Sequence, residues 1–559
     1  MPAAKTLPIE VYLADRLTEA VGRAGLALPD GARIEIEVPR EEGRGDWASA
    51  VALVLAKSAK RPPRQVADAI VAAFEPDPGV LDRIEIAGPG FLNFHLSAAW
   101  LHRMIREIAA SPDTYGATEA GRGERVLVEY VSANPTGPLN VVSARAASFG
   151  DALVRLLRAA GYAADGEFYV NDWGLQAELF GASVRSRFAE ARGLPAPPIP
   201  EEGYAGSYVG ELAATLDPKE GTAWLGLEER EQRLRFGTWA IDRMVASQRS
   251  ALETFGVRMD RWFSEGDLHR ARALDIALEK LAKAGYLDER DGARWFRATA
   301  FGDQEDRVLV RSNGIPTYFL ADTAYHENKF ERGYDRLIDL WGPDHHGHVI
   351  RMKGILQALG HDPARFEVIV LQWVKLLRGG EVVKMSKRAG EFISMDELVE
   401  EVGVDAARFF FLMRRAESPL DFDMELAAKR TEENPVYYVQ YAHARIVHVL
   451  DYARGQGAPE PNAESADLSL LSEPEAQAVM RALAGFPSLV AASAKAHEPH
   501  RITSYLKELA ATFHVFYHHH RVVTADAPLT EARLLLTQAT GAVIRRALGL
   551  LGVSAPEAM

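Results

Sequence analysis

The chain has 559 residues, 47% hydrophobic and 25% charged, which is the composition of a soluble protein long enough for three or four domains. It has no cysteine, which excludes disulfides and thiolate metal sites, and we find no signal peptide and no apolar run that would span a bilayer, so a cytoplasmic protein is expected. The net charge of −14 argues against a nucleic-acid partner, but residues 426–559 hold 12 Lys and Arg against 13 Asp and Glu, which permits local basic faces.

Residues 1–112 are expected to form a separate α+β domain. Leu13 to Leu26 has helical periodicity, and Ala32 to Val38 alternates as a half-buried strand does. Trp47 to Ala56 returns to a helical pattern, and Arg83 to Leu96 is typical of two strands around a Gly-Pro-Gly turn. On these residues alone the domain is an accessory module.

A β-loop-α-β unit follows at residues 125–172. The β-branched residues from Val126 to Val131 predict a strand, and the helix that begins at Val141 ends at Gly161, before a second strand at Glu167 to Val170. The loop between strand and helix is polar and contains two prolines. Such a unit places polar groups opposite a helix N-terminus that favours phosphate, although many proteins contain one without a nucleotide.

Residues 185–300 are expected to be a charged, helix-rich insertion between two halves of a parallel sheet, with amphipathic helices at 228–255 and 271–287. The second half of the sheet is predicted from strands at 307–311, 336–342 and 366–371, with helices at 322–330 and 349–359. Consecutive β/α units predict a doubly wound, Rossmann-like parallel sheet with ligands at its carboxyl edge.

Three side chains at that edge suit a cationic ligand. Tyr318 and Asp322 lie four residues apart at a strand-to-helix junction, and Glu129 ends the first strand and adds a second carboxylate. A guanidinium requires planar acceptors, and two carboxylates with a phenol suit it better than they suit an ammonium. The alternative is that each carboxylate pairs with a neighbouring Lys or Arg.

Three further clusters of charged or histidine side chains have simple structural interpretations. The histidines of the run Trp341 to His348 lack the one-face spacing of a helical zinc site, so we expect no protein-bound zinc and interpret the run as a cap for the following helix. The loop around Lys384, Lys387 and Arg388 is by default a solvated basic turn. His518 to His520 is interpreted as a helix end that faces solvent or a binding partner.

Residues 426–559 are predicted to be an all-α bundle. Pro435 to Leu450 is a long amphipathic helix, an acidic linker occupies 455–475, and further helices are expected at 502–517 and 533–551.

Several motifs, in the same order along the whole chain, resemble the class I aminoacyl-tRNA synthetases, and among them arginyl-tRNA synthetase. They are Gly45-Asp-Trp-Ala48, Ser132-Ala-Asn-Pro-Thr-Gly-Pro-Leu139, Gly150-Asp-Ala-Leu153, Trp341-Gly-Pro-Asp-His-His-Gly347, Lys384-Met-Ser-Lys-Arg388 and Tyr438-Val-Gln-Tyr-Ala-His-Ala-Arg445. The resemblance implies a tRNA-contacting domain at 1–112, a catalytic domain at 113–425 with the insertion at about 185–300 and the lysine loop at 384–388, and an anticodon-binding domain at 426–559.

The resemblance also implies roles for individual residues. Arginine would be bound by Glu129, Ser132, Asn134, Tyr318 and Asp322. ATP would be bound by Asn140, Val142, Ser143, His345, Lys384, Met385, Ser386, Lys387 and Arg388, of which Asn140, Ser143, Lys384 and Lys387 would be catalytic. Tyr437, Tyr441 and Arg445 would contact tRNA(Arg). ATP would be used with Mg²⁺, and a monomer that contacts no membrane is expected.

One departure affects the nucleotide signature. The family carries His-Ile-Gly-His or a close variant, whereas residues 140–143 are Asn-Val-Val-Ser, so two hydrogen-bonding side chains remain but Val142 adds a branched side chain. Two functions therefore remain open: an arginine–tRNA ligase, or a catalytically weakened tRNA-binding relative. The arginine-site residues and the lysine loop favour the ligase, and the C-terminal bundle counts against a third reading as an arginine-binding metabolic enzyme.

Overall fold

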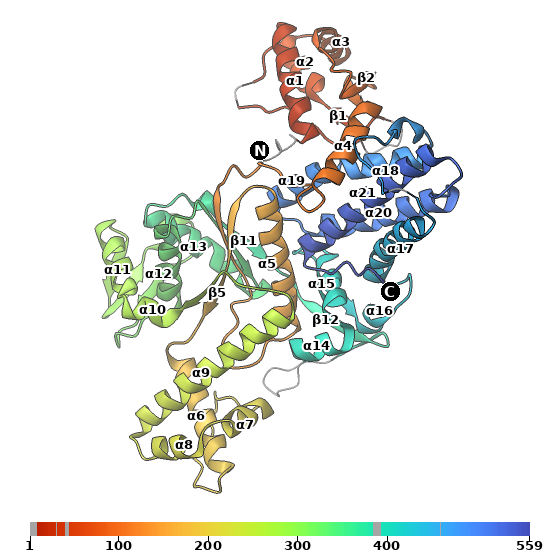
Figure 1. Ribbon diagram of the computed structural model, residues 1–559. Coiled ribbons are helices and arrows are strands. Elements are labelled where there is room, and N and C mark those ends of the chain that lie inside the picture. The colour runs from red at the N-terminus through yellow and green to blue at the C-terminus, as the bar shows by residue number, and fades with distance from the viewer. Residues whose placement is uncertain (1–7, 30, 40–43, 384–392, 459) are drawn as a thin grey trace.

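Five parallel strands form the central sheet, in the order β11-β10-β4-β5-β6 (Figure 1). The computed structural model describes residues 8–29, 31–39, 44–383, 393–458 and 460–559. The strand order reverses between β4 and β10, so the predicted doubly wound, Rossmann-like sheet is confirmed. The strands are β4 Arg125–Glu129, β5 Ala163–Val170, β6 Arg261–Ser264, β10 Arg336–Trp341 and β11 Phe366–Val370.

Helix α5 (Val141–Ala159) lies against this sheet because its contact face is almost entirely apolar or small. At Gly150 a Cβ atom would lie 2.2 Å from the ring of Tyr130, so only glycine lets the helix approach the sheet closely. The helix begins at Asn140, whose side chain caps it, and therefore its N-terminus is held at the carboxyl edge of β4.

The N-terminal domain has a small antiparallel sheet, β1-β3-β2, with four helices. The strand predicted at residues 32–38 is wrong, since Glu37 alone forms a bridge there, to Ala48. The helix predicted from Trp47 to Ala56 is confirmed from Val51 onward, but Trp47–Ser49 is a strand paired with β3. Pairing with β3 overrides the local helical pattern. The elements are α1 Ile9–Arg23, β1 Trp47–Ser49, α2 Val51–Ala59, α3 Pro63–Ala73, β2 Leu81–Ala87, β3 Phe91–Leu96 and α4 Ala98–Ala110.

The predicted insertion is interrupted by strand β6, which pairs with β5 and belongs to the central sheet. Before β6, four helices form a separate core: α6 Leu175–Glu190, α7 Ser207–Ala214, α8 Pro218–Leu225 and α9 Glu229–Thr254. After β6, α10 Glu265–Arg270 and α11 Ala273–Lys283 lead to an antiparallel sheet of β7 Leu287–Arg290, β8 Ala293–Phe296 and β9 Arg307–Val310, with η1 Ala298–Phe301. The strand at 307–311 was expected in the parallel sheet, and this prediction is wrong because β9 pairs with β8 instead.

Helix α12 (Tyr318–Glu331) begins four residues before the predicted start, so Tyr318 lies in its first turn. The chain from residue 343 to residue 428 forms a third three-stranded sheet, β13-β12-β14, and short helices. These elements are η2 Pro343–His345, α13 His346–Ala358, η3 Pro363–Arg365, β12 Val374–Arg378, β13 Glu381–Val382, α14 Met395–Val402, α15 Val404–Leu412, β14 Leu420–Asp423 and α16 Met424–Ala428.

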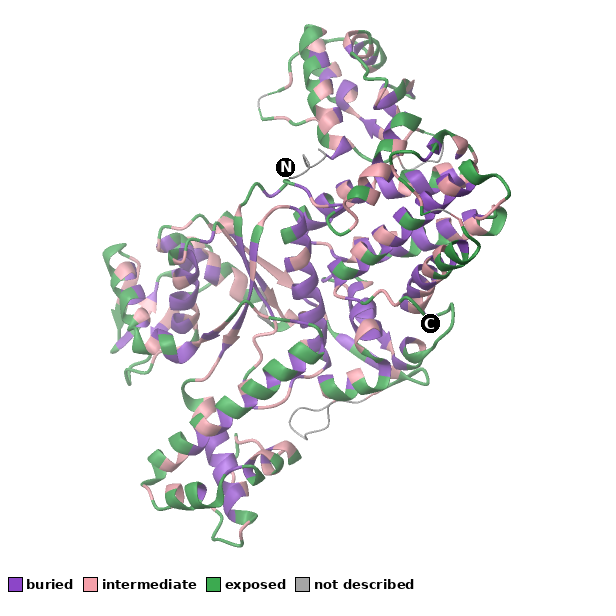
Figure 2. Cartoon of the chain, viewed as in Figure 1, coloured by how far each residue is buried: buried purple, intermediate pink, exposed green. Residues whose placement is uncertain are grey.

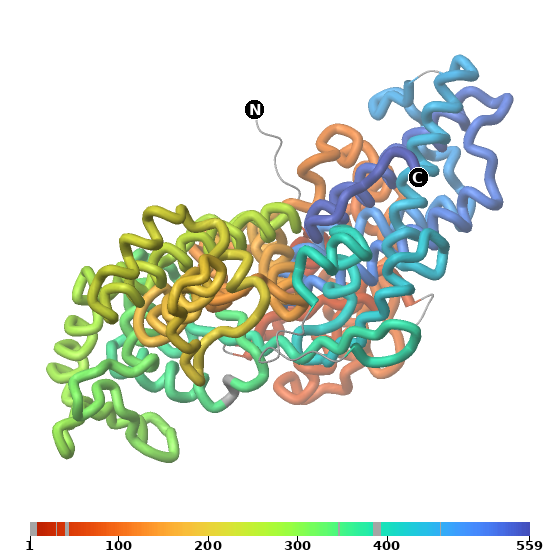
Figure 3. Tube along the Cα trace, turned by 90° about the horizontal axis from the view of Figure 1, so that it is seen from below, coloured from red at the N-terminus to blue at the C-terminus, as the bar shows by residue number. Residues whose placement is uncertain are grey.

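The C-terminal region is the predicted helical bundle, and it projects from a different side of the sheet than α6–α9 do (Figure 1, Figure 3). Among the described residues, α21 alone is long and apolar enough to cross a membrane. However, 72% of its apolar window is buried, as expected for a core helix of the bundle (Figure 2). The helices are α17 Pro435–Gly455, η4 Leu468–Leu470, α18 Pro474–Ala484, α19 Phe486–Lys495, α20 His500–His519 and α21 Ala527–Leu551.

A buried arginine joins three of these parts. Arg408 of α15, fully buried, bonds the carboxylate of Asp151 on α5, and it donates to the carbonyls of Phe255 at 3.2 Å and Leu551 at 3.0 Å. The carboxyl ends of α9 and α21 thus meet at one guanidinium, which suits the negative ends of two helix dipoles.

Candidate active site

A cavity of about 1000 Å³ opens at the carboxyl edge of the sheet, where the strand order reverses between β4 and β10. Its walls come from the loop after β4, the first turns of α5 and α12, the end of β10 and the insertion. The structure brings together around it those residues predicted to bind arginine or ATP whose side chains it describes: Glu129, Ser132, Asn134, Asn140, Val142, Ser143, Tyr318 and Asp322. Lys384, Met385, Ser386, Lys387 and Arg388 lie outside the described residues, as does the side chain of His345.

The loop after β4 contains left-handed backbone and is held by a side chain of the insertion. Val131 and Ser132 have φ angles of 70° and 39°, and left-handed backbone is costly for a β-branched residue. Gln248 of α9, buried, donates to the carbonyls of Asn134 and Gly137 at 3.1 and 2.8 Å. Residues of the insertion therefore fix the shape of the pocket wall, a role that the sequence analysis did not foresee.

Both carboxylate oxygens of Glu129 accept a hydrogen bond. Ser132 donates its hydroxyl to Oε1 at 2.8 Å, and the ammonium of Lys329 donates to Oε2 at 2.6 Å. Burial raises the pKa of Glu129, and Lys329 opposes that rise. The alternative in which a carboxylate pairs with a neighbouring Lys thus holds for Glu129, which nevertheless still lines the cavity.

Asp322 is placed differently, because its ion-pair partner within the described part of the chain is a histidine. Its Oδ2 lies 3.1 Å from Nε2 of His348, and 37% of its side chain is exposed. Tyr318, one turn earlier on α12, is 58% exposed to the cavity mouth. The predicted convergence of this phenol and carboxylate on one ligand is therefore geometrically possible.

Glu265, in the first turn of α10, is a residue that the sequence analysis missed. It is buried beside Tyr169, and burial raises its pKa to about 7, with Asp322 and Asp172 adding to the rise. Asp322 thus disfavours the charged form of Glu265, and Oε1 of Glu265 lies 3.6 Å from Nε2 of His269 on the same helix. Recognising β6 as a parallel strand would have located Glu265, because it follows β6 at the same edge of the sheet.

The start of α5 carries the altered signature. The side-chain oxygen of Asn140 accepts from the backbone N–H groups of Val142 and Ser143 at 3.0 and 3.2 Å, so it caps the helix. Val142 is 43% exposed on the cavity wall. Ser394, which follows the undescribed segment, forms a bridge with Asn140, so the chain returns from the lysine-rich segment to this helix N-terminus.

Glu129, His326 and Asp339 form the group of possible metal ligands among the described residues, with ligand atoms within 4.8 Å of one another. The ammonium of Lys329 bonds both carboxylates, at 2.6 and 2.8 Å. The cluster therefore contains its own cation and does not fit a resident metal.

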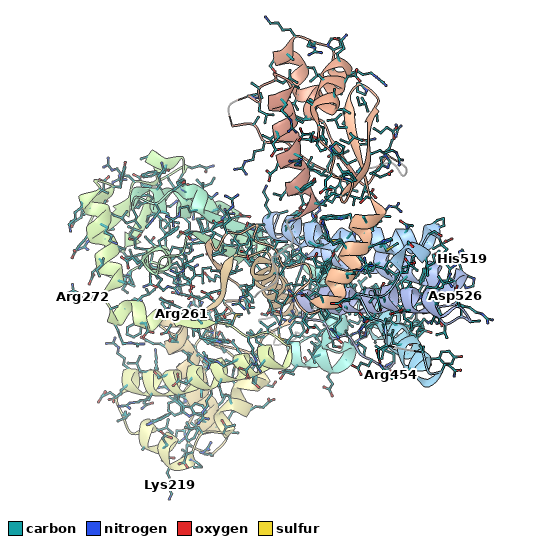
Figure 4. The ribbon with its side chains drawn as sticks, turned by 45° about the horizontal axis from the view of Figure 1, so that its top comes forward. Lys219, Arg261, Arg272, Arg454, His519 and Asp526 are labelled. Carbon is teal, nitrogen blue, oxygen red and sulfur yellow. The ribbon has the colours of Figure 1, made fainter. Side chains whose placement is uncertain are left out.

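The three residues expected to contact tRNA lie on one face of α17. Tyr437 and Tyr441 stack with ring centroids 6.2 Å apart, and the guanidinium of Arg445 lies 4.6 Å above the Tyr441 ring. His514 of α20 packs against Tyr441. Figure 4 shows Arg454, His519 and Asp526 at the end of this bundle that is remote from the sheet.

Fold and site together define a class I aminoacyl-tRNA synthetase, since residues 105–200 and 230–418 match the family described as "tRNA synthetases class I (R), catalytic domain". Residues 11–96 match "Arginyl tRNA synthetase N terminal domain" and residues 439–559 match "DALR anticodon binding domain". The chain belongs to the arginyl-tRNA synthetase family.

Named relatives agree with this assignment. The chain is 48% identical to an arginine–tRNA ligase of Moorella thermoacetica over 98% of each chain. It is also 48% identical to the arginine–tRNA ligase of Desulforamulus reducens over 94% of this chain and 93% of that one. The arginyl-tRNA synthetase structure of Thermus thermophilus superposes with a TM-score of 0.77 at 23% identity, over 99% of this chain and 100% of that one, and supports the fold.

Proposed function

We propose that this protein is an arginine–tRNA ligase. It condenses L-arginine with ATP to arginyl adenylate and pyrophosphate, and then transfers the arginyl group to the terminal adenosine of tRNA(Arg) with release of AMP. The observation that carries the proposal is the partly exposed carboxylate of Asp322 with Tyr318 one turn earlier on the cavity wall, which suits a guanidinium, in a chain related over its whole length to arginine–tRNA ligases.

Arginine is oriented by the two ends of the cavity. Asp322, Glu265 and Tyr318 receive the guanidinium. Glu129 and Ser132 lie at the end of β4, where the loop runs on to Asn134 and the start of α5, and they receive the α-ammonium. This direction places the substrate carboxylate toward the helix N-terminus, where phosphate is favoured.

ATP occupies the opposite side of the cavity. The N-terminus of α5 attracts the phosphates, with Asn140 shaping the turn and Ser143 supplying a hydroxyl donor. Lys384 and Lys387 stabilise charge that develops on the departing pyrophosphate, a role supported by the return of the chain to Asn140. ATP enters as its Mg²⁺ complex, so the ion is part of the substrate and neutralises phosphate charge.

tRNA(Arg) contacts the helical bundle through the stacked face of Tyr437, Tyr441 and Arg445, because aromatic rings and a guanidinium offer stacking surfaces to unpaired bases. The N-terminal domain, at 1–112, contacts the body of the tRNA. The enzyme acts as a cytoplasmic monomer.

The test is aminoacylation of total tRNA with each labelled amino acid in turn. Arginine alone should give a strong signal, and a signal with another amino acid would refute the assignment of the pocket. The weakened relative with a crowded nucleotide site would give no signal with any amino acid. The ligases at 43–48% identity do not favour that alternative.

A further inference from the structure

Four charged or ionisable side chains are packed together under the floor of the arginine pocket. Lys329 of α12 is fully buried, and its ammonium lies 2.6 Å from Oε2 of Glu129 and 2.8 Å from Oδ1 of Asp339. His326, one turn earlier on α12, has Nε2 2.7 Å from Oδ2 of Asp339. Glu129 and Asp339 are register partners on β4 and β10, so the cluster sits where the strand order reverses.

Stability alone does not account for this arrangement. Taking an ammonium and two carboxylates out of water costs several kcal/mol per ion, and apolar residues of similar volume are often as stabilising. Both carboxylates line the cavity, but the side chain of Asp339 is 1% exposed and that of Glu129 is 11% exposed. The buried ammonium therefore bonds the carboxylate of the cluster that is the more open to a substrate.

We propose that Lys329 is a positioning residue for arginine: it keeps Glu129 ionised and fixed, so that the carboxylate receives the α-ammonium of the substrate. The inference rests on the proposed role of Glu129. Without the ammonium, two neighbouring buried carboxylates would share a proton, because like charges in one site raise the pKa of one partner. A protonated or rotated Glu129 no longer offers a full negative charge to the substrate.

Lys329 also couples the two ends of the pocket through α12. Nδ1 of His326 lies 2.7 Å from the backbone carbonyl of Asp322, and its Nε2 contacts Asp339, which Lys329 joins to Glu129. The residues proposed for the guanidinium and for the α-ammonium are therefore connected by continuous contacts. The position of Glu129 relative to Asp322, and hence the length of amino acid that fits, depends on Lys329.

The first test compares Lys329→Met with Lys280→Met by steady-state aminoacylation. Lys280 is a matched control, because it also bonds two carboxylates, those of Glu327 and Glu331, but outside the cavity. Lys329→Met should raise the KM for arginine at least tenfold and leave the KM for ATP within twofold, while Lys280→Met changes neither. An unchanged arginine KM in Lys329→Met, or equal rises in both constants, would overturn the proposal.

The second test asks whether Lys329 acts through Glu129. Glu129→Gln should raise the arginine KM, and adding Lys329→Met to it should cause no further rise, because the group that Lys329 holds has already lost its charge. A further rise of the same factor would overturn the positioning role. If Glu129→Gln leaves the KM unchanged while Lys329→Met raises it, the proposed role of Glu129 is what fails. Lys329→Gln replaces Lys329→Met under the same criteria if the latter does not fold.

Discussion

Replacing Asp322 by asparagine tests the guanidinium end of the pocket. The substitution keeps the shape of the side chain and one hydrogen-bond acceptor, and it removes the negative charge. A charge-assisted hydrogen bond contributes about 1.5–3 kcal/mol. Because 37% of the Asp322 side chain is exposed, water screens part of this interaction, and a loss of about 1.5–2 kcal/mol is expected.

At about 1.4 kcal/mol per tenfold change, Asp322→Asn should raise the KM for arginine roughly 10- to 30-fold, with the KM for ATP nearly unchanged. Glu265 remains in this variant and keeps part of the affinity. Discrimination against citrulline, the neutral isostere of arginine, should fall by a similar factor, since the lost charge distinguishes the two.

The assay is steady-state arginylation with each substrate varied in turn. Glu331→Gln is the matched control: it removes a carboxylate from the other end of the same helix, 53% exposed and bonded to Lys280. Equal effects of Asp322→Asn on both Michaelis constants, or unchanged discrimination against citrulline, would remove Asp322 from the guanidinium site.

Three further predictions concern other parts of the molecule. Burial raises the pKa of Glu265 to about 7, so the contribution of Glu265 to the free energy of unfolding should fall as pH rises from about 4.5 to 7. Arginine binding at pH 6.5 should release a proton, which titration calorimetry in two buffers detects and which Glu265→Gln abolishes. Asn140→Asp should keep the helix cap and the melting temperature, but it should slow adenylate formation at least tenfold in single-turnover assays, because a carboxylate there repels phosphate. A wild-type rate would exclude Asn140 from the nucleotide site. Arg408→Met should lower the free energy of unfolding in urea by about 3–5 kcal/mol, whereas the control Arg415→Met, at an exposed ion pair, should lower it by less than about 1 kcal/mol. Equal losses would show that the buried pair of Arg408 and Asp151 is not the cause.

The sequence predicted strands β4, β10 and β11 well because each is rich in apolar residues and bounded by turns, but it missed β6. It failed where pairing is decided at long range. Residues 307–310 have the same local pattern as a core strand, but they pair with β8, and residues 32–38 alternate without forming a strand. Such outcomes depend on which partner is available, and local periodicity contains no information about that.

The candidate site was predictable in part for the same reason. Tyr318, Asp322 and Glu129 stand at strand ends or helix starts, which the motifs indicate. Glu265 is distant in sequence and follows a strand that was assigned to an insertion, so its place at the carboxyl edge of the sheet could not be predicted. The partner of Glu129 could not be predicted either, because Lys329 is one of many lysines until the fold brings it under β4.

The two ends of the pocket therefore differ in how their charge is balanced. Glu129 shares the ammonium of Lys329, so it is held in place before any substrate arrives. Burial raises the pKa of Glu265 to about 7, although Nε2 of His269 lies 3.6 Å from its carboxylate, so its ionised form is the costly one in the folded protein. A substrate whose side chain is cationic favours the ionised forms of both Glu265 and Asp322, whereas a neutral side chain gives neither acid this compensation. Selectivity for arginine then arises from the cost of the unfilled guanidinium end, while the α-ammonium end, common to all amino acids, contributes orientation.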